Sequence, residues 1–231
     1  MGELQRTGTR HRRGELMRSS EIYLIRHGVR QGFVDPSWKQ SALEPNDPPL
    51  AESGLRQGDD IAAALAESGI LAIYCSPFLR ALQTAAASSK RTGIPVRVEP
   101  GFGEWLNPEF FSFPPRLLSG PNTPGVCPLV DADYIPAHTP GGLELDEAVE
   151  VRARVKSTID TILLRAPGES FAAFTHGSPL GQSAVAFLGG LDGVDTRMGS
   201  ITHIACHDGM FELVSSGCDH LSDQDEYLRF H

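Results

Sequence analysis

Four short segments rich in apolar residues recur along the first three quarters of the chain, at residues 21–27, 70–75, 96–99 and 170–175. The first segment contains Ile22, Tyr23, Leu24 and Ile25 without a polar interruption. A continuous apolar run of this length is typical of a strand that is buried on both faces, as in a parallel sheet covered by helices. The pattern therefore predicts four strands, the first of them buried on both faces.

Segments with helical periodicity separate these strands, at residues 55–68, 76–93 and 146–165, and a further helix is predicted to end at Leu188. Ser76 is a suitable N-cap for the second helix, Pro77 suits its first position, and Gly93 ends it. Residues 201–206 and 210–215 flank Asp208-Gly209, which predicts a hairpin. Strands that alternate with helices predict an α/β fold, a three-layer sandwich in which helices cover both faces of a mostly parallel sheet. The C-terminal hairpin then forms an edge of that sheet.

The chain divides into one domain and two flanking segments. Residues 1–20 are expected to be a disordered basic leader, residues 21–220 the domain, and residues 221–231 a C-terminal tail. Residues 31–53 and 100–145 carry many turn-forming residues and are predicted to be loops. A loop as long as 100–145 inside a compact domain is usually functional, so we expect it to form a lid over the site.

Composition narrows the range of partners. The chain has 231 residues and a formal net charge of −9, so its surface lacks the general basic character that nucleic acids and anionic membranes require. No apolar run approaches the ~20 residues that span a bilayer. Its four cysteines include no CxxC pair, which indicates a reduced, intracellular and therefore cytoplasmic protein.

Polar residues cluster where the predicted strands end. Because ligands of open α/β sheets bind beyond the carboxyl ends of the strands, these residues are predicted to share one rim. They are Arg26, His27, Gly28, Arg30, Arg80, Glu104 and His176. Arginine side chains offer planar, bidentate donors that match phosphate oxygens, so the rim predicts a phosphate site. Gly28 would let a phosphate approach the backbone.

The remaining polar residues of this rim suit phosphoryl transfer. A histidine beside a bound phosphate can act as a nucleophile through a ring nitrogen, and His27 is the candidate. A nearby carboxylic acid, Glu104, can protonate the departing alkoxide and later deprotonate a water molecule. Taken singly each residue is a weak signal, whereas their placement after four successive strands is specific.

These stretches resemble the histidine phosphatase, or phosphoglycerate mutase-like, superfamily over residues 21–215. Within it the chain is most similar to the branch of the suppressor-of-T-cell-receptor-signalling phosphatases and the ecdysteroid-phosphate phosphatase. The resemblance rests on RHGVR (26–30), NDPPL (46–50), SPFLRALQTA (76–85), VRVEPGFGEW (96–105), DADY (131–134) and THGS (175–178). In that branch the first motif usually reads Arg-His-Gly-Glu-Arg, whereas this chain has Val29 in place of the glutamate.

The resemblance implies a phosphomonoester hydrolase that forms a phosphohistidine on His27, with Glu104 as proton donor. It implies that Arg26, Arg30, Arg80 and His176 bind the phosphate, and that neither a metal nor another cofactor is needed. The expected partner is a phosphorylated small molecule or a phosphopeptide, with no nucleic acid and no membrane. Two alternatives stay open, a phosphoglycerate mutase-type transferase and a catalytically idle scaffold subunit like those that some similar proteins form in the RNA polymerase III machinery.

Two features of the loops each have a structural and a functional interpretation. Asn46 and Asp47 lie either in a rigid turn or in a loop that contacts the substrate. Trp105 is a candidate substrate contact together with the neighbouring phenylalanines and Trp38, but aromatic residues more often form a core, and here we favour a small core beneath the lid.

Overall fold

The computed structural model describes residues 19–111, 115, 117, 125–139 and 141–223. The predicted leader and tail lie almost entirely outside these ranges, as does part of the predicted lid. The described chain forms a six-stranded sheet with the strand order β3-β2-β4-β1-β5-β6. The strands are β1 (Ser19–Arg26), β2 (Ala72–Cys75), β3 (Val96–Val98), β4 (Phe171–Thr175), β5 (Ile201–His207) and β6 (Met210–Gly217).

The sheet is parallel where the sequence predicts it and antiparallel at the hairpin. Strands β1, β2, β3 and β4 run parallel to one another, whereas β5 pairs antiparallel with both β1 and β6. The turn between β5 and β6 places Asp208 and Gly209 at φ values of 51° and 81°, the left-handed region that a tight hairpin turn requires. The predicted mixed sheet with a hairpin edge is confirmed.

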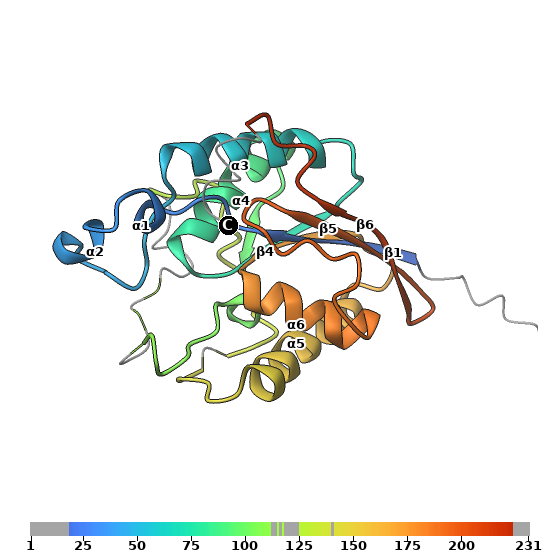
Figure 1. Ribbon diagram of the computed structural model, residues 1–231. Helices are drawn as coiled ribbons and strands as arrows, with labels where there is room; N and C mark the ends of the chain where they lie inside the picture. The colour runs from blue at the N-terminus through green and yellow to red at the C-terminus, as the bar shows by residue number, and fades with distance from the viewer. Residues whose placement is uncertain (1–18, 112–114, 116, 118–124, 140, 224–231) are drawn as a thin grey trace, which may run out of the picture.

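Helices cover both faces of the sheet, which confirms the three-layer sandwich (Figure 1). One face carries α3 (Glu52–Leu65) and α4 (Leu79–Thr92), and the other carries α5 (Arg152–Arg165) and α6 (Gly177–Leu188). Each face has its own buried apolar cluster, one centred on Ile25, Ile73 and Phe174 and the other on Leu24, Phe102 and Phe171. In both, the strand residues on one face of the sheet pack against helices, as the uninterrupted apolar runs require.

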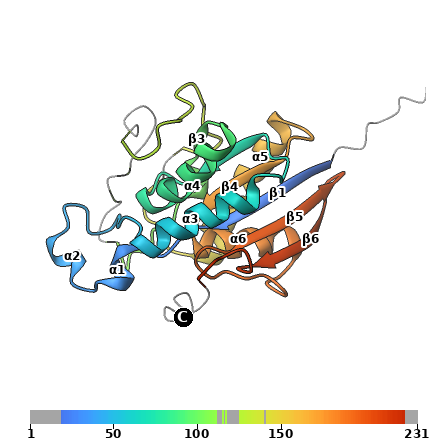
Figure 2. The same cartoon turned by 90° about the horizontal axis from the view of Figure 1, so that it is seen from above.

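The connections contain short elements that periodicity did not predict. Two four-residue helices, α1 (Gln31–Val34) and α2 (Trp38–Ser41), lie within the segment predicted to be a loop, and they extend beyond one end of the sheet (Figure 2). A 3-10 turn, η1 (Pro100–Phe102), follows β3, and a π-helical turn, η3 (Glu147–Val151), leads into α5. None of the helices in the described part of the chain has the length and apolar composition needed to cross a bilayer.

Helix α3 begins earlier than the sequence indicates, because Gly54 belongs to its first turn rather than to a preceding loop. At this point α3 packs directly on the backbone that follows β1. A Cβ atom at Gly54 would overlap the carbonyl oxygen of Val29, and a Cβ atom at Gly28 would lie 2.6 Å from the carbonyl oxygen of Gly54. Both glycines are therefore required by close backbone packing.

We predict that Gly54→Ala destabilises the fold by roughly 1–3 kcal/mol, since two backbones must separate to admit the methyl group. Gly58→Ala on the same helix is the matched control. A Cβ atom there would lie 3.7 Å from Thr84, in ordinary contact, so the higher helix propensity of alanine should raise stability by up to about 1 kcal/mol. Urea denaturation measures both changes, and equal effects of the two substitutions would contradict the packing argument.

Candidate active site

The carboxyl ends of β1, β2 and β4 and the turn after β3 bring the predicted site residues together. His27 follows β1, Ser76 follows β2, Glu104 follows η1, and His176 follows β4. The edges are aligned, because Arg26 pairs with Thr175 and Cys75 pairs with Phe174 in the sheet register. Four segments that are distant in sequence therefore meet at one edge of the sheet.

His27 is buried, and its hydrogen bonds define which ring nitrogen carries the proton. Its Nδ1 lies 2.7 Å from the carbonyl oxygen of Gly28, which can only accept, so Nδ1 is the donor. Its Nε2 accepts a hydrogen bond of 3.0 Å from Nε of Arg80. Burial, and then the charges of Arg80 and Arg26, hold the pKa of His27 well below its usual 6.5. The ring is therefore neutral near pH 7, and its Nε2 lone pair is directed at the arginine cluster.

Arg80 connects the polar groups of the site. Besides the bond from Nε to His27, its Nη2 donates to Oε2 of Glu104 at 3.2 Å. Its Nη1 lies 3.7 Å from Oδ1 of Asp47 and makes no hydrogen bond to any residue that the structure describes. The guanidinium also stacks over the ring of Phe78, 4.6 Å from the ring centroid. A buried donor in this position is suited to a phosphate oxygen.

His176 is fully buried, and its ring lies edge-on to that of His27 with the centroids 5.1 Å apart. Oγ of Ser76 accepts the amide hydrogen of Phe78 and lies 2.7 Å from Nε2 of His176. Nδ1 of His176 is 3.4 Å from Oε2 of Glu104. These contacts favour the tautomer in which Ser76 donates to Nε2 and Nδ1 carries the hydrogen toward Glu104. Burial, and then Arg80, hold the pKa of His176 well below 6.5, so this ring is a neutral donor.

Arg26 and Arg30 add positive charge on either side of His27. Arg26 donates from Nη1 to the carbonyl oxygen of Thr196 at 2.6 Å. Arg30 lies over the ring of Phe33, 4.4 Å from its centroid, and burial followed by the charge of Arg80 lowers the pKa of Arg30 to about 10. Both guanidinium groups remain charged at neutral pH, so three cations surround one neutral histidine.

A cavity of about 500 Å³ lies at these arginines, and the fully buried His176 is not among its lining residues. Arg26, His27, Arg30, Arg80 and Glu104 line it on one side. Its other walls come from the connection between β1 and α3, which carries α1 and α2, and from the segment after Glu104. The aromatic residues of these walls are Phe33, Trp38, Trp105, Phe110 and Phe111. Of the described residues between 100 and 145, Glu104, Trp105, Phe110 and Phe111 line this cavity.

The aromatic residues do not form the small core that we favoured from the sequence. Phe110 is 70% exposed, Trp38, Trp105 and Phe111 are only half-buried, and all four line the cavity instead of an interior cluster. Periodicity cannot distinguish a loop that covers apolar side chains from one that presents them to a cavity. Phe113 lies outside the described residues.

Gly28 and Val29 have roles that the sequence did not reveal. Gly28 does not line the cavity among its described residues; its missing side chain faces α3, its amide donates to Thr84, and its carbonyl orients His27. These contacts give Gly28 a packing role, and its approach to a phosphate stays a prediction. Val29 is 1% exposed and packs with Ala51 and Met198, where a glutamate would be buried among apolar groups.

The loop candidates separate into two groups. Asn46 and Trp105 line the cavity, as a substrate contact requires. Asp47 is only 5% exposed and turns away from the cavity, toward the start of α4 and Arg80.

Ser76, predicted to cap α4, lies too early for that role, because α4 begins at Leu79, and its hydroxyl contacts His176 instead.

Sequence reasoning missed Arg154 and Glu144, which hold the Glu104 segment in place. Arg154 projects from α5 and donates to the carbonyl oxygens of Gly101 and Gly103 at 2.8 and 2.9 Å. The same guanidinium binds both carboxylate oxygens of Glu144, at 2.7 and 2.9 Å. Glu144 in turn accepts the indole hydrogen of Trp105 through its backbone carbonyl. No motif signals such a brace, because the two glycine carbonyls lie 53 and 51 positions from Arg154 in the chain.

The charge of the site suits an anion better than a metal ion. Within the described ranges, His27, Glu104 and His176 are the one group of at least three suitable side chains whose ligand atoms lie within 4.8 Å of one another. Arg80 already contacts both His27 and Glu104, and Arg26 and Arg30 add further positive charge nearby. A divalent cation would meet this repulsion, whereas a phosphate dianion would be stabilised.

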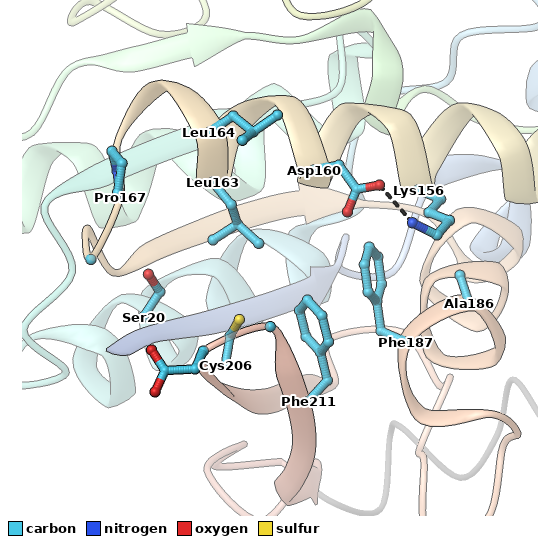
Figure 3. A pocket seen from close by; sticks show the side chains of 13 residues that line it. Ser20, Lys156, Asp160, Leu163, Leu164, Pro167, Ala186, Phe187, Cys206 and Phe211 are labelled. Carbon is cyan, nitrogen blue, oxygen red and sulfur yellow. Dashed lines mark hydrogen bonds and ion pairs between the residues drawn. The ribbon is translucent and has the colours of Figure 1, made fainter. Parts of the chain in front are cut away.

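A second cavity, of about 700 Å³, lies at the opposite end of the sheet (Figure 3). Leu163 of α5, Phe187 of α6 and Phe211 of β6 point into it, and the ion pair between Lys156 and Asp160 lies at its rim. It contains neither a histidine nor an arginine among its described lining residues. Among its described residues, this second cavity therefore lacks the arginine cluster and the nucleophile candidate found at the carboxyl ends of the strands.

Comparison with known proteins agrees with this geometry. The sequence model of the histidine phosphatase superfamily (branch 1) matches residues 22–219. The chain is similar to the ubiquitin-associated and SH3 domain-containing protein A of Homo sapiens, with 31% identity over 153 residues. This match covers 62% of the chain and 23% of that protein. It is also similar to the transcription factor tau 55 kDa subunit of Saccharomyces cerevisiae, with 36% identity over 92 residues that cover 38% of the chain and 21% of that subunit. The matches thus span about a fifth of each relative's length.

Among solved structures, the chain resembles the ecdysone phosphate phosphatase from Bombix mori in complex with tungstate. The TM-score is 0.65 and the sequence identity is 17%, with 85% of this chain and 92% of that chain covered. At this identity the likeness concerns the fold alone. The predicted phosphoglycerate mutase-like architecture is confirmed.

We predict that Arg154→Met costs about 3–5 kcal/mol of stability, because it leaves the largely buried carboxylate of Glu144 and two carbonyl oxygens without their donor. Arg152→Met is the matched control on the same helix. Arg152 makes a single hydrogen bond to Gln182, so the control should change stability by no more than about 0.5 kcal/mol. Chemical denaturation distinguishes the two, and a loss in Arg154→Met no greater than in the control would contradict the bracing role.

Proposed function

The chain belongs to the histidine phosphatase superfamily, and from this premise we propose that it is a phosphomonoester hydrolase that forms a phosphohistidine on His27. Membership in the superfamily indicates a phosphatase or phosphoryl-transfer enzyme. The observation that supports the finer proposal is the buried, neutral His27, whose Nε2 lone pair faces the arginine cluster at the floor of the cavity.

In the first step Nε2 of His27 attacks the phosphorus in line with the ester bond. A bond forms between nitrogen and phosphorus, the bond from phosphorus to the ester oxygen breaks, and Glu104 transfers a proton to the departing alkoxide. Arg26, Arg30 and Arg80 neutralise the phosphoryl oxygens, and Nδ1–H of His176 adds a neutral donor. For the attack, Nε of Arg80 gives up its hydrogen bond to Nε2 of His27, which frees the lone pair, while the other groups stabilise the transition state from positions that the fold already fixes.

In the second step water attacks the phosphohistidine. Glu104, now a carboxylate, removes a proton from the water, the nitrogen–phosphorus bond breaks, and inorganic phosphate is released. The hydrogen bond from Nδ1 of His27 to the Gly28 carbonyl supports both steps, because it holds the ring in one tautomer and stabilises positive charge that develops on the imidazole. The mechanism uses no metal and no other cofactor.

The substrate is proposed to be a phosphomonoester whose alcohol is bulky and apolar or aromatic. Five aromatic side chains line the cavity next to the arginines, and two of them, Phe33 and Phe110, are exposed. Such rings offer stacking and apolar contact to the organic part of the substrate. A small phosphorylated molecule or a phosphotyrosine side chain would both meet this requirement.

We expect His27→Ala to reduce the hydrolysis of p-nitrophenyl phosphate by at least about a thousandfold while thermal stability is retained, because the nucleophile is removed. His207→Ala is the control, since His207 is exposed on β5 at the far end of the sheet. Mass spectrometry after an acid-free quench should find phosphate on His27 during turnover. Undiminished hydrolysis in His27→Ala would mean that another residue is the nucleophile.

Assays of the purified protein for isomerisation and for ester hydrolysis distinguish the hydrolase from a mutase and from an idle scaffold subunit. A mutase would isomerise 3-phosphoglycerate in the presence of bisphosphoglycerate and hydrolyse esters negligibly, whereas an idle scaffold subunit would do neither. We expect ester hydrolysis to dominate, because the wall that follows Glu104 carries aromatic rings instead of further cations to hold a second anionic group.

For substrate preference, we expect Phe110→Ala to raise KM for p-nitrophenyl phosphate by about 2- to 12-fold, the loss of one aromatic contact worth ~0.5–1.5 kcal/mol. The KM for phosphoserine, which lacks an apolar group, should not change. Leu43→Ala is the control, because Leu43 is 99% exposed and does not line the cavity. Equal changes in KM for both substrates would argue against an apolar contact at Phe110.

A further inference from the structure

Asp47 is a buried acid that the mechanism above does not use. Its neighbours Asn46 and Pro48 line the cavity, but the carboxylate of Asp47 points to the protein interior. Its amide donates to the carbonyl oxygen of Glu44, which fixes a turn in this loop. The residue thus sits between the substrate-facing loop and helix α4.

The first contact of Asp47 is with the start of α4. Oδ1 accepts the amide hydrogen of Leu79, the first residue of the helix, at 2.9 Å. Phe78, which precedes Leu79, has an apolar side chain and cannot supply this bond itself. A residue 32 positions earlier in the chain therefore caps the helix, and its negative charge lies at the positive end of the helix dipole.

The second contact is with Arg80, the next residue of the helix. Oδ1 of Asp47 lies 3.7 Å from Nη1 of Arg80, and both side chains are at most 5% exposed. The three nitrogens of this guanidinium are thus directed at three partners: Nε at His27, Nη2 at Glu104 and Nη1 at Asp47. The rotation of a planar guanidinium is defined when groups on three sides hold it.

We propose that Asp47 is a positioning residue, whose carboxylate holds the start of α4 and the guanidinium of Arg80 so that Arg80 faces His27 and the phosphate. This inference rests on the proposed function, because it assigns Arg80 to phosphate binding. It also links the loop that lines the substrate cavity to the group that contacts the nucleophile.

The protonation of Asp47 gives this role a pH dependence. The charged groups that act on Asp47 are Arg80 of α4 and Glu44 of its own loop. Burial raises the pKa of Asp47 to about 6, although Arg80 and the Leu79 amide oppose the shift and Glu44 adds to it slightly. Above this pH the carboxylate holds Arg80, and below it the neutral acid does so weakly. Turnover should therefore decline as the pH falls through about 6.

The effect on stability has the opposite sign. Because the pKa of Asp47 is raised above its unfolded value of 3.8, the folded state binds this proton more tightly than the unfolded state does. A neutral side chain at position 47 therefore costs the fold no stability near pH 7, provided that it still accepts the Leu79 hydrogen bond. Asp47→Asn meets this condition, whereas Asp47→Ala removes both the charge and the cap.

The test measures kcat from pH 5 to 8 with p-nitrophenyl phosphate, together with thermal unfolding. We expect Asp47→Asn to lower kcat about tenfold at pH 7, to lose the decline near pH 6, and to unfold at an unchanged or higher temperature. Asp47→Ala should lose activity and also unfold at a lower temperature. Glu44→Gln is the matched control, since it removes an exposed charge from the same loop and should keep the wild-type kcat.

Nitrogen NMR of the His27 ring supplies a readout that does not depend on turnover. Asp47→Asn should shift the Nε2 resonance of His27, because the hydrogen bond from Arg80 changes, and Glu44→Gln should not. A wild-type kcat, pH profile and His27 spectrum in Asp47→Asn would overturn the proposal and leave Asp47 as a helix cap only. Activity of His27→Ala, measured in parallel, separates the two ideas: full hydrolysis there would refute the proposed nucleophile, whatever the result for Asp47.

Discussion

The site depends on one buried guanidinium. Arg80 contacts the nucleophile candidate His27, the acid candidate Glu104 and the carboxylate of Asp47, and each of these residues comes from a different segment of the chain. A buried cation is stable only when acceptors and counter-charges surround it, so the positions of these three residues are coupled. The same condition explains why the loop that carries Asp47, the start of α4 and the segment after η1 converge here.

The state of the two histidines follows from that arrangement. Burial and neighbouring arginines disfavour a second proton on either ring, and hydrogen bonds from the backbone and from Ser76 then decide which nitrogen keeps the one that remains. His27 presents a lone pair and His176 presents an N–H group, although the two residues have the same chemistry. Both rings carry their hydrogen on Nδ1. In His27 this nitrogen is turned to the Gly28 carbonyl, which leaves the Nε2 lone pair toward Arg80, whereas in His176 it is Nε2 that is turned to Ser76, which leaves Nδ1–H toward Glu104.

Two sets of contacts hold the segments that carry His27 and Glu104: close backbone packing at Gly28 and Gly54, and the ion pair between Arg154 and Glu144. Gly28 and Gly54 allow α3 to reach the chain just after β1, and this contact fixes the backbone that carries His27. On the other side of the sheet, Arg154 and Glu144 hold the turn that ends in Glu104. The two candidate catalytic groups are therefore held from opposite faces of the sheet, so their separation depends on the packing of both helix layers.

Local signals in the sequence determined the succession of strands and helices along the chain. Apolar runs, helix periodicity and the Asp208-Gly209 turn define a mixed α/β sheet, and the residues after each strand define the rim where the site lies. They also identified the arginines, His27, Glu104 and His176 as neighbours, because the ends of parallel strands meet at one edge. Tertiary structure alone decided the roles of Asp47, Val29 and Arg154, the start of α4, and the exposure of the aromatic wall. Each of these depends on a contact between segments far apart in sequence, and such contacts leave no periodicity or local motif by which they could be predicted.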